Sequence, residues 1–388
     1  MIIIGAGPIG LMLANLLGRQ KINALVLEKE AVPPDDSRAI GLMPPSLRIL
    51  KPLGLDQAFI REAVKVREAF VHGNKKPIGS VRFNSLPSEY KFILSLPQSR
   101  TQALLLENLK KYSCVRILRG KAFHSLYFHD ANIEIHARDP QNGRHTRYFC
   151  EFLCACDGSK SAVRRFLGIP YRGKRYRDTF LMADFIDNSG LGAQVHLFFT
   201  PDGAVESFPL PQGQRRWIVQ TSRLMPQHDT DFIRSTVQKR TGVDISSCKA
   251  LGQSAFGVEH FSIKSYALRD RLFFCGDAAH TMSPVGGQGM NTGFADALLL
   301  SDLLSRVIHG GEPVTRLARL YSRNRKKAAA QAAGRAWLSM RIGTLKGKIS
   351  STLRHTLILL LLRSLKNRIP PYFSMLTIKN RVFNEKPR

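Results

Sequence analysis

The first 28 residues read as strand, glycine turn, helix, strand and acid, and this order restricts the fold more than any other stretch. The five parts fall at residues 1–4, 5–10, 11–17, 23–27 and 28. The turn has the spacing GxGxxG, in which Gly5 permits a tight turn, Gly7 lets backbone approach a pyrophosphate, and Gly10 lets helix and strand pack closely. Glu28 is placed to bind ribose hydroxyls. The motif predicts a dinucleotide site and does not by itself distinguish NAD from FAD.

A second ligand-binding stretch lies near the other end of the chain and reads RLFFCGDAAHTMSPVGGQGMNTGFAD, starting at Arg271. Its apolar run at 272–275 predicts a strand that closes at Gly276 and Asp277, and residues 294–304 have the spacing of a helix. Strand, glycine-rich loop and helix N-terminus would form a corner that receives an anion, because bare N–H groups and the helix dipole point at it. An acid cannot serve the same anion, so we expect Asp277 to accept a hydrogen bond from a sugar or ribityl hydroxyl.

The two stretches are about 270 residues apart, which requires either a long ligand or an interrupted domain. A third motif, CDGSKSAVR at 156–164, lies between them. In this order, the GxGxxG turn, the DG motif and the GD motif with P-x-x-G-Q-G-x-N resemble the three fingerprints of the single-component (group A) flavoprotein aromatic hydroxylases. That class includes para-hydroxybenzoate hydroxylase, phenol hydroxylase and the ubiquinone-pathway hydroxylases. The resemblance covers roughly residues 1–330.

The resemblance implies FAD as the cofactor. Arg38 would lie beside the flavin, Gln98 would contact the flavin chain, and Arg164 would link flavin and NAD(P)H handling. On the sequence alone, Arg38 could equally be a solvated loop residue and Gln98 an ordinary residue at a helix start. Pro284 and Gly289 would lie at the oxygen site, and no side chain is assigned as a catalytic acid or base. The complete cofactor-binding set is Gly5, Gly7, Gly10, Glu28, Arg38, Gln98, Asp157, Gly158, Arg164, Gly276, Asp277, Gly286, Gly287, Gln288, Gly289, Met290 and Asn291.

The predicted fold is α/β, with a Rossmann-like FAD-binding domain interleaved with a mixed-sheet substrate domain, plus a helical C-terminal segment. Strand-like runs between 115 and 155 are expected to form a small antiparallel sheet that interrupts the nucleotide-binding domain. The expected boundaries are 1–70, 96–175 and 265–330 for the FAD-binding domain, 71–95 and 176–264 for the substrate domain, and 331–388 for the basic helical segment.

No substrate residue can be assigned from the sequence. His196, Phe198, Phe208, Trp217 and Gln220 lie on strand-like runs and could line a pocket for a flat, largely apolar substrate. Alternation along a half-buried strand puts aromatic residues on one face in any case, so a core position is the better interpretation of each.

The resemblance predicts an FAD-dependent monooxygenase that hydroxylates an aromatic substrate with NAD(P)H and O₂. The substrate would be phenolic, and a polyketide or a prenylated quinone precursor would also suit. Two alternatives stay open: an FAD-dependent reductase or dehydrogenase acting on an isoprenoid or quinone-like substrate, and a membrane-associated FAD-binding protein without hydroxylase activity. No metal site is predicted, because Cys150, Cys154 and Cys156 have the wrong spacing for a zinc pair.

The net charge of +29 is concentrated near the end of the chain. Residues 306–388 hold nineteen Lys and Arg but two Asp and Glu, a net charge of +17. Within them, Leu357 to Leu362 is an apolar run that is too short to span a bilayer, which needs about twenty residues. It fits either an interfacial helix on an anionic membrane or a helix docked on the core. We expect a cytoplasmic protein, peripheral on the inner face of a membrane in the first case, with no nucleic-acid partner.

Overall fold

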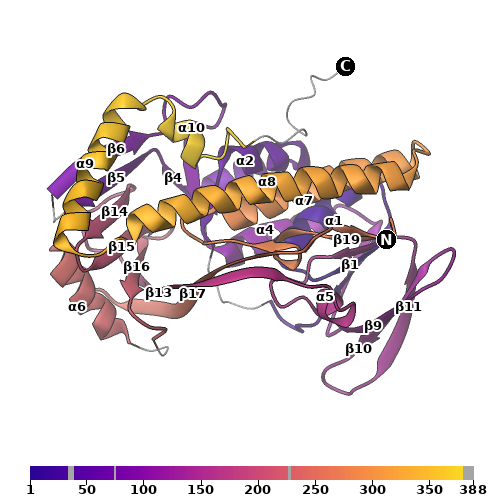
Figure 1. The fold of residues 1–388 in the computed structure, drawn as a ribbon. Helices are drawn as coiled ribbons and strands as arrows, with labels where there is room; N and C mark the ends of the chain where they lie inside the picture. The colour runs from indigo at the N-terminus through magenta and orange to yellow at the C-terminus, as the bar shows by residue number, and fades with distance from the viewer. Residues whose placement is uncertain (34–38, 74–75, 226–228, 379–388) are drawn as a thin grey trace.

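The computed structural model describes residues 1–33, 39–73, 76–225 and 229–378. Its first layer is a six-stranded sheet in which five neighbouring strands run parallel and β18 is antiparallel to β19 (Figure 1). In spatial order the strands are β18 (Ala267–Leu268), β19 (Leu272–Phe274), β12 (Leu153–Ala155), β1 (Ile2–Ile4), β2 (Ala24–Glu28) and β8 (Val115–Arg119). The three central strands β19, β12 and β1 are entirely buried, as parallel strands covered by helices must be.

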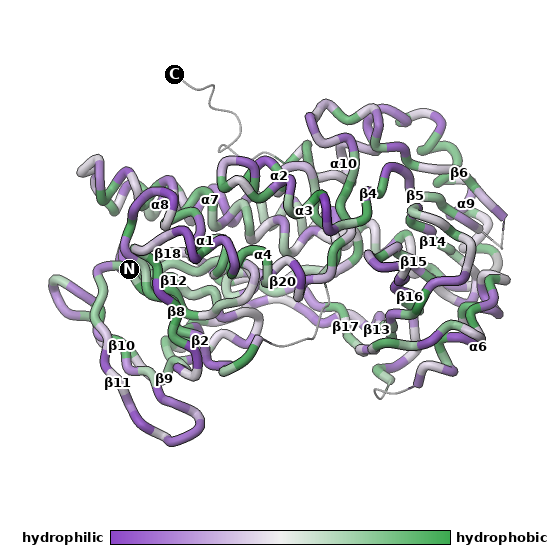
Figure 2. The backbone as a smooth tube through the Cα atoms, turned by 180° about the vertical axis from the view of Figure 1, so that it is seen from behind, coloured by the Kyte–Doolittle hydropathy of each residue, from purple (hydrophilic) through white to green (hydrophobic). Residues whose placement is uncertain are grey.

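Four long helices belong to this layer. They are α1 (Pro8–Arg19), α4 (Gln98–Leu109), α7 (Gln288–Ile308) and α8 (Val314–Gly343). α1 packs against both α4 and α7, so its residues from Gly10 to Gly18 are all buried. Figure 2 shows hydrophobic residues gathered in the parallel sheet around β12, and hydrophilic residues on the loops of β10 and β11.

The second layer is an eight-stranded mixed sheet in the order β20-β17-β13-β16-β15-β14-β5-β6. Only β14 and β5 pair in parallel within its described strands. The strands are β20 (His280–Thr281), β17 (Ala250–Ser262), β13 (Arg172–Ile186), β16 (Gln214–Thr221), β15 (Gly203–Leu210), β14 (Val195–Thr200), β5 (Glu68–Gly73) and β6 (Lys76–Arg82). Helix α6 (Thr230–Thr241) covers one face through Ile233 and Val237.

The C-terminal helices join the two layers. α8 runs from the parallel sheet, where Tyr321 lies in the main core, to the mixed sheet, where Met340 packs against Phe180 and Val258 (Figure 1). α9 (Lys348–Ser364) and α10 (Ile369–Phe373) then pack along β6. No helix in the described ranges is both long enough and apolar enough to cross a membrane.

The strand-like runs between 115 and 155 do not all form the small antiparallel sheet that we expected. That sheet contains β9 (Ala122–Phe128), β10 (Ile133–Arg138) and β11 (His145–Cys150). The run at 115–119 is instead β8, which pairs in parallel with β2, and 153–155 is β12 at the centre of the large sheet. The expectation was wrong for β8 because α4 supplies the crossover that carries the chain from β2 to a parallel neighbour.

The remaining described elements are short. A three-stranded sheet contains β3 (Gly41–Leu42), β7 (Ile93–Ser95) and β4 (Val64–Val66), and three helices are α2 (Pro44–Leu50), α3 (Asp56–Glu62) and α5 (Ala162–Phe166). The α/β class with a Rossmann-like sheet, a mixed sheet and C-terminal helices is confirmed. The division into six segments stays a prediction.

Candidate cofactor and active site at the carboxyl edge of the parallel sheet

The three sequence motifs leave the parallel sheet at the same edge. Ile4, Ala155 and Phe274, the last residues of β1, β12 and β19, lie side by side in register. Each strand leads directly into one motif: the GxGxxG turn, the DG motif and the GD motif. The chain order of the strands reverses between β1 and β12, and ligands of open α/β sheets bind at such a reversal. The sheet therefore brings together motifs that are far apart in the sequence.

The glycine turn after β1 has room for a ligand at one position. Gly5 has φ +102°, and a Cβ there would lie 2.6 Å from the carbonyl oxygen of Cys156. A Cβ on Gly10 would lie 1.9 Å from the carbonyl oxygen of Gly5, so helix and turn pack too closely for any side chain. By contrast, a Cβ on Gly7 would meet no described atom within 4 Å. The turn is thus closed on its protein side and open at Gly7.

Two other predicted cofactor residues, Glu28 and Gln98, accept hydrogen bonds from backbone N–H groups. The Glu28 carboxylate accepts hydrogen bonds from the N–H groups of Ala6 (2.6 Å) and Glu30 (2.9 Å), which hold it against the turn. Gln98 is the first residue of α4, and its Oε1 accepts a hydrogen bond from the N–H of Ala39 at 3.4 Å. Arg38 lies outside the described residues.

The DG motif is built around a capping carboxylate. Asp157 Oδ2 accepts hydrogen bonds from the N–H groups of Ala162 (2.7 Å) and Val163 (3.1 Å), at the start of α5. Burial raises the pKa of Asp157, and its hydrogen bonds oppose that shift. Gly158 has φ +78°. A Cβ on Gly158 would meet no described atom within 4 Å, so the turn stays open on that side.

Arg164 connects the DG motif to the GD motif. Its buried guanidinium donates to the carbonyl oxygen of Ala278 at 2.9 Å and to that of Ser159, and it lies 3.8 Å from the ring centroid of Tyr171. Burial lowers the pKa of this guanidinium. These contacts are made with the protein itself, so the predicted contact of Arg164 with the cofactor stays a prediction.

The GD motif presents one acid at the open edge of the sheet. Gly276 and Ala278 are buried, whereas Asp277 between them is exposed. Gly276 has φ +58°, and a Cβ there would lie 2.9 Å from Cγ1 of Ile9 at the start of α1. A Cβ on Gly293 of α7 would lie 2.5 Å from Cδ1 of the same Ile9. The starts of α1 and α7 and the GD turn therefore pack around one isoleucine side chain.

The glycine-rich loop ends earlier than we expected. α7 begins at Gln288 rather than at 294, after Gly286 (φ +84°) and Gly287 (φ +63°) take the left-handed conformation. The N–H groups of the first helical turn have no acceptor within a helix, and this turn contains Gln288, Gly289 and Met290. Among the described side chains none caps α7, no acid lies in its first turn, and Pro284 is exposed before it. The N–H groups of this helix N-terminus could therefore donate hydrogen bonds to an electron-rich group.

Asn291 joins this loop to the start of α2. Its Oδ1 accepts hydrogen bonds from the N–H of Met43 (2.8 Å) and the hydroxyl of Ser46 (2.6 Å). Its Nδ2 donates to the carbonyl oxygens of Gly41 (2.9 Å) and Gly287 (2.7 Å). The side chain of Asn291 is therefore engaged by the protein on both ends, so it positions the loop, and its predicted cofactor contact stays a prediction.

A buried charged group that we did not predict lies under the GD turn. The Asp296 carboxylate accepts hydrogen bonds from the N–H of Gly276 (3.0 Å), from His280 Nε2 (2.7 Å) and from Arg325 Nε (2.5 Å). Burial alone would raise the pKa of Asp296, but Arg325 and His280 hold it below its ordinary value. An acid within an otherwise apolar helix face, as in GFADALLL, was the available sequence signal.

The aromatic candidates of the mixed sheet lie on two different faces. Phe198 and Trp217 belong to the buried cluster beneath α6, and the His196 ring stacks on that of His72 with centroids 5.2 Å apart. The Gln220 side chain is hydrogen-bonded by the protein at both ends. Phe208 and Gln220 lie on the opposite face, where Phe208 packs in a cluster with α9 and α10 and Gln220 pairs with Phe180 of β13. The core interpretation thus fits Phe198 and Trp217.

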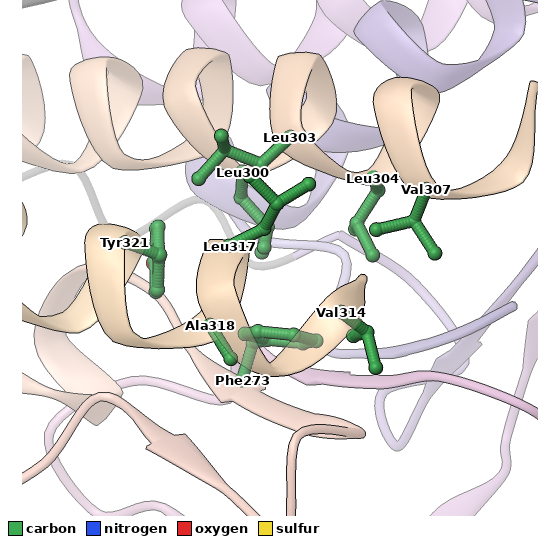
Figure 3. Close-up of a pocket in the computed structure, with 9 residues that line it drawn as sticks. All are labelled: Phe273, Leu300, Leu303, Leu304, Val307, Val314, Leu317, Ala318 and Tyr321. Carbon is green, nitrogen blue, oxygen red and sulfur yellow. The ribbon is translucent and has the colours of Figure 1, made fainter. Parts of the chain in front are cut away.

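One small cavity lies away from these motifs, between α7 and α8 (Figure 3). Its volume is about 10 Å³ and its lining is apolar except for Tyr321, whose hydroxyl donates to the carbonyl oxygen of Phe274. A buried water needs two to four polar partners, so this space is a packing defect and not a binding site.

The residues at the carboxyl edge fit a flavin dinucleotide. Such a ligand needs anion-receiving helix N-termini, an approach to the backbone and an acid for hydroxyl groups. Here no described side chain caps α1 or α7, their first turns contain no acid, Gly7 is open, and Asp277 is exposed. Among the described side chains, no group of three or more His, Cys, Asp and Glu could hold a metal ion.

Comparison with known proteins agrees with this geometry. A family model described as an FAD binding domain matches residues 1–336. The chain is 31% identical over 320 residues to 6-methylpretetramide 4-monooxygenase from Streptomyces rimosus, which covers 80% of this chain and 56% of that protein. It spans little more than half the length of the curated relatives that it matches.

Two solved structures share the fold. OxyS anhydrotetracycline hydroxylase from Streptomyces rimosus has a TM-score of 0.81 and 27% identity over 97% of this chain and 76% of that one. The p-nitrophenol 4-monooxygenase PnpA from Pseudomonas putida DLL-E4 has a TM-score of 0.88 over 98% of both chains, at 20% identity.

Proposed function

This chain belongs to the FAD-binding domain family, and on that premise we propose that it is an FAD-dependent monooxygenase that adds one oxygen atom of O₂ to an aromatic ring, with NAD(P)H as reductant. The observation that carries the proposal is the meeting of three motifs at the carboxyl edge of β1, β12 and β19, beside the mixed sheet. A relative with 31% identity is named 6-methylpretetramide 4-monooxygenase, and a neighbour with 27% identity is named anhydrotetracycline hydroxylase.

The bound FAD would supply the redox chemistry, and the protein would bind it, orient it and exclude water. The N–H groups at the start of α1, next to the open Gly7, would bind the pyrophosphate. Asp277 would accept a hydrogen bond from a ribityl hydroxyl, and Glu28 one from the ribose. The first turn of α7, at Gln288, Gly289 and Met290, would stabilise negative charge that develops at the nearby ring edge.

The substrate side would be formed by the face of the mixed sheet that looks away from α6. Ile218 of this sheet and Val285 of the glycine-rich loop pack against one cluster that contains Phe180, Val258 and Met340. Apolar side chains from loop and sheet would suit a flat aromatic ring and would keep water away from the reacting atoms. A phenol, an aromatic polyketide or a prenylated quinone precursor has the required chemistry.

A reductase that consumes no O₂ is the competing function, and labelled oxygen separates the two. The purified holoenzyme is incubated with NADH or NADPH and a panel of phenols and hydroxylated polycycles under ¹⁸O₂. We expect faster NAD(P)H oxidation with the right substrate and one ¹⁸O atom in the product. Product that is reduced without O₂ uptake, or that takes its oxygen from water, would replace the monooxygenase by the alternative.

We further propose that α9 brings the protein to the cytoplasmic face of an anionic membrane. The helix is docked on the protein, because His355 Nε2 contacts the carbonyl oxygen of Phe199 at 2.8 Å and Leu362 packs over Gly79. Its outer side nevertheless exposes an apolar stripe with the spacing of one helix face, consisting of Ile349 (80% exposed), Leu353 (67%), Leu357 (47%) and Leu360 (56%).

Exposed cations flank this stripe at both ends. Lys346 precedes the helix, and Arg363, Lys366 and Arg368 follow its apolar run. A stripe of large apolar side chains next to basic residues is typical of an interfacial helix on anionic lipid. The two alternatives for Leu357–Leu362 are therefore compatible, since one side of α9 docks on the sheet while the other faces outward.

A further inference from the structure

A buried carboxyl group on the mixed sheet has no hydrogen-bond partner among the residues that the structure describes. Glu206 lies in the middle of β15 and is 9% exposed. Leu197 of β14 and Ile218 of β16 flank it in register, and both are apolar. Within the described part of the chain, no backbone or side-chain group donates a hydrogen bond to this carboxyl. Buried polar groups in proteins are nearly always hydrogen-bonded, so the exception requires an explanation.

The side chain of Glu206 is on the face of the sheet that looks away from α6. Its neighbour Val205 packs with Ile233 of α6, and successive residues of a strand point to opposite faces. Glu206 therefore shares its face with Leu197 and Ile218. Figure 1 shows α9 and the end of α8 beside this part of the sheet.

This face also meets the glycine-rich loop of the candidate cofactor site. Ile218 packs against the same cluster as Val285, which precedes the first turn of α7. The cluster contains Met340 from the end of α8. Glu206 thus belongs to the strand positions that border the expected substrate space, on the same side of the sheet as the loop.

Another acid on the same face, Asp184, is paired with an arginine, as expected for a partly buried carboxylate with a structural role. Asp184 of β13 receives hydrogen bonds from Arg216 Nε at 2.7 Å and from its terminal nitrogen at 2.8 Å. Arg216 lies opposite Phe208 on β15, and Phe208 is the next residue after Glu206 on the same face of that strand. An arginine is therefore close by in the sheet, yet it is engaged by Asp184 and not by Glu206.

Leaving an acid unpaired in an apolar place is unfavourable for folding alone. Burial raises the pKa of Glu206 to about 7, so near neutral pH the group exists in both forms. Ionisable groups kept in such an environment occur mostly at functional sites, where a ligand completes their hydrogen bonds. A leucine of similar size would suit Leu197 and Ile218 better than a carboxyl does.

We propose that Glu206 is a substrate-binding residue whose carboxyl accepts the hydrogen bond of a hydroxyl group carried by the aromatic ring. The inference rests on the proposed function, since the ligand is its substrate. A hydroxyl is the donor that matches the site. The apolar flanking residues would cover the ring, and the carboxyl would accept the single hydrogen bond that the hydroxyl donates. A ring that carries a methyl ether in place of the hydroxyl leaves the carboxyl unpaired and is rejected.

Equilibrium binding to the oxidised holoenzyme, without NAD(P)H, tests this subsite. The probes are 4-nitrophenol and 2-naphthol, each compared with its methyl ether, and binding is followed by the change in flavin absorbance. We expect the wild type to favour each phenol over its ether by about tenfold or more, which is the usual range for a hydrogen bond to a charged group. Glu206→Leu should abolish the preference for the phenol and raise the melting temperature. Glu206→Gln should reduce the preference for the phenol.

The stability readout separates ligand binding from a structural role. If Glu206 supported the fold, Glu206→Leu would lower the melting temperature, and the proposal would be overturned. Asp231→Asn, which removes an exposed acid of the same lobe, is the control and should leave the preference unchanged. A preference that survives in Glu206→Leu refutes the assignment of Glu206 alone. If the wild type binds neither phenol nor ether, the aromatic substrate itself is wrong and both proposals fall.

Discussion

The carboxylate of Asp296 in α7 and the guanidinium of Arg325 in α8 form an ion pair of 2.5 Å, with both side chains buried. The same carboxylate receives the N–H of Gly276, so the pair fixes the GD turn to two helices at once. Arg325 also donates to the carbonyl oxygen of Thr292 at 3.2 Å, which holds the start of α7. A buried charge pair thus holds a turn whose next residue, Asp277, is exposed at the carboxyl edge of the parallel sheet.

Replacing Asp296 by asparagine should destabilise the protein strongly. Arg325 would keep its charge in the core without a counter-charge, and breaking a buried pair in this way costs roughly 3–5 kcal/mol. Chemical denaturation of the apoprotein measures the loss. Asp302→Asn in the same helix is the control, because Asp302 is only half-buried. Equal stability changes in the two variants would show that the buried pair has no special role.

The same ion pair should make the free energy of unfolding depend on pH in the acid range. The folded-state pKa of Asp296 is below its ordinary value, so the unfolded chain takes up a proton first as the pH falls. The stabilisation is therefore present above the ordinary Asp value of about 4 and is lost as the pH falls through the lower folded value. Denaturation curves between about pH 2 and pH 6 should show a weaker acid loss in Asp296→Asn than in the wild type. Parallel pH profiles would contradict this.

Two glycines of the first turn should separate folding from cofactor binding. Gly7→Ala places a methyl group where no described atom lies within 4 Å, so the apoprotein should keep its stability while its affinity for FAD falls. Gly10→Ala places the methyl group 1.9 Å from the carbonyl oxygen of Gly5, so it should damage the fold itself. Melting temperature of the apoprotein and titration with FAD measure the two effects. Unchanged FAD affinity in Gly7→Ala would show that the pyrophosphate does not bind at this turn.

The Asn291 side chain should couple energetically to Ser46. Removing a buried partner from a hydrogen bond costs about 1–3 kcal/mol, so Asn291→Ala, which breaks four bonds, should cost at least that much. Ser46→Ala removes only the 2.6 Å bond. In a double-mutant cycle, the two changes together should cost less than their sum by roughly 0.5–3 kcal/mol. Additive costs would mean that this hydrogen bond does not join α2 to α7.

The sequence predicted what depends on local pattern. The strands at 1–4, 23–27 and 272–275 and the first helix were placed to within a few residues, because apolar runs and glycine turns are local signals. α7 starts earlier than the pattern predicts, because Gly289 and Gly293 lower the helix propensity of a turn that neighbouring elements stabilise. The hydroxyl of Ser46, which lies within α2 (Pro44–Leu50), donates to Asn291, and this contact between distant segments has no local signal.

Pairings between distant residues could not be predicted in this way. The ion pair of Asp296 with Arg325 joins two helices, and the contacts of Arg164 with Ala278 join two motifs. Arg216 pairs with Asp184 and not with Glu206, and this depends on the register of three strands, β13, β16 and β15. Such choices are made by tertiary packing, which a single sequence does not display.

The exposed stripe of α9 should bind anionic vesicles through both its leucines and its cations. Lipid attracts each nearby Lys or Arg by about 1 kcal/mol, and each methylene that enters the interface adds about 0.8 kcal/mol. Leu353→Ser with Leu357→Ser should therefore weaken flotation with anionic vesicles by about tenfold or more. Lys366→Glu with Arg368→Glu should weaken it as well, and high salt should remove the part of the binding that is due to charge.

The matched control for these variants is Phe149→Ser, which removes another large exposed apolar side chain (59% exposed) on β11. It should leave flotation unchanged, because β11 belongs to a separate small sheet. Size-exclusion chromatography of the same variants tests the other use of an apolar helix face, contact with a second copy of the chain. A dimer that Leu353→Ser with Leu357→Ser dissociates, with no flotation of the wild type at low salt, would assign α9 to self-association and refute the membrane contact.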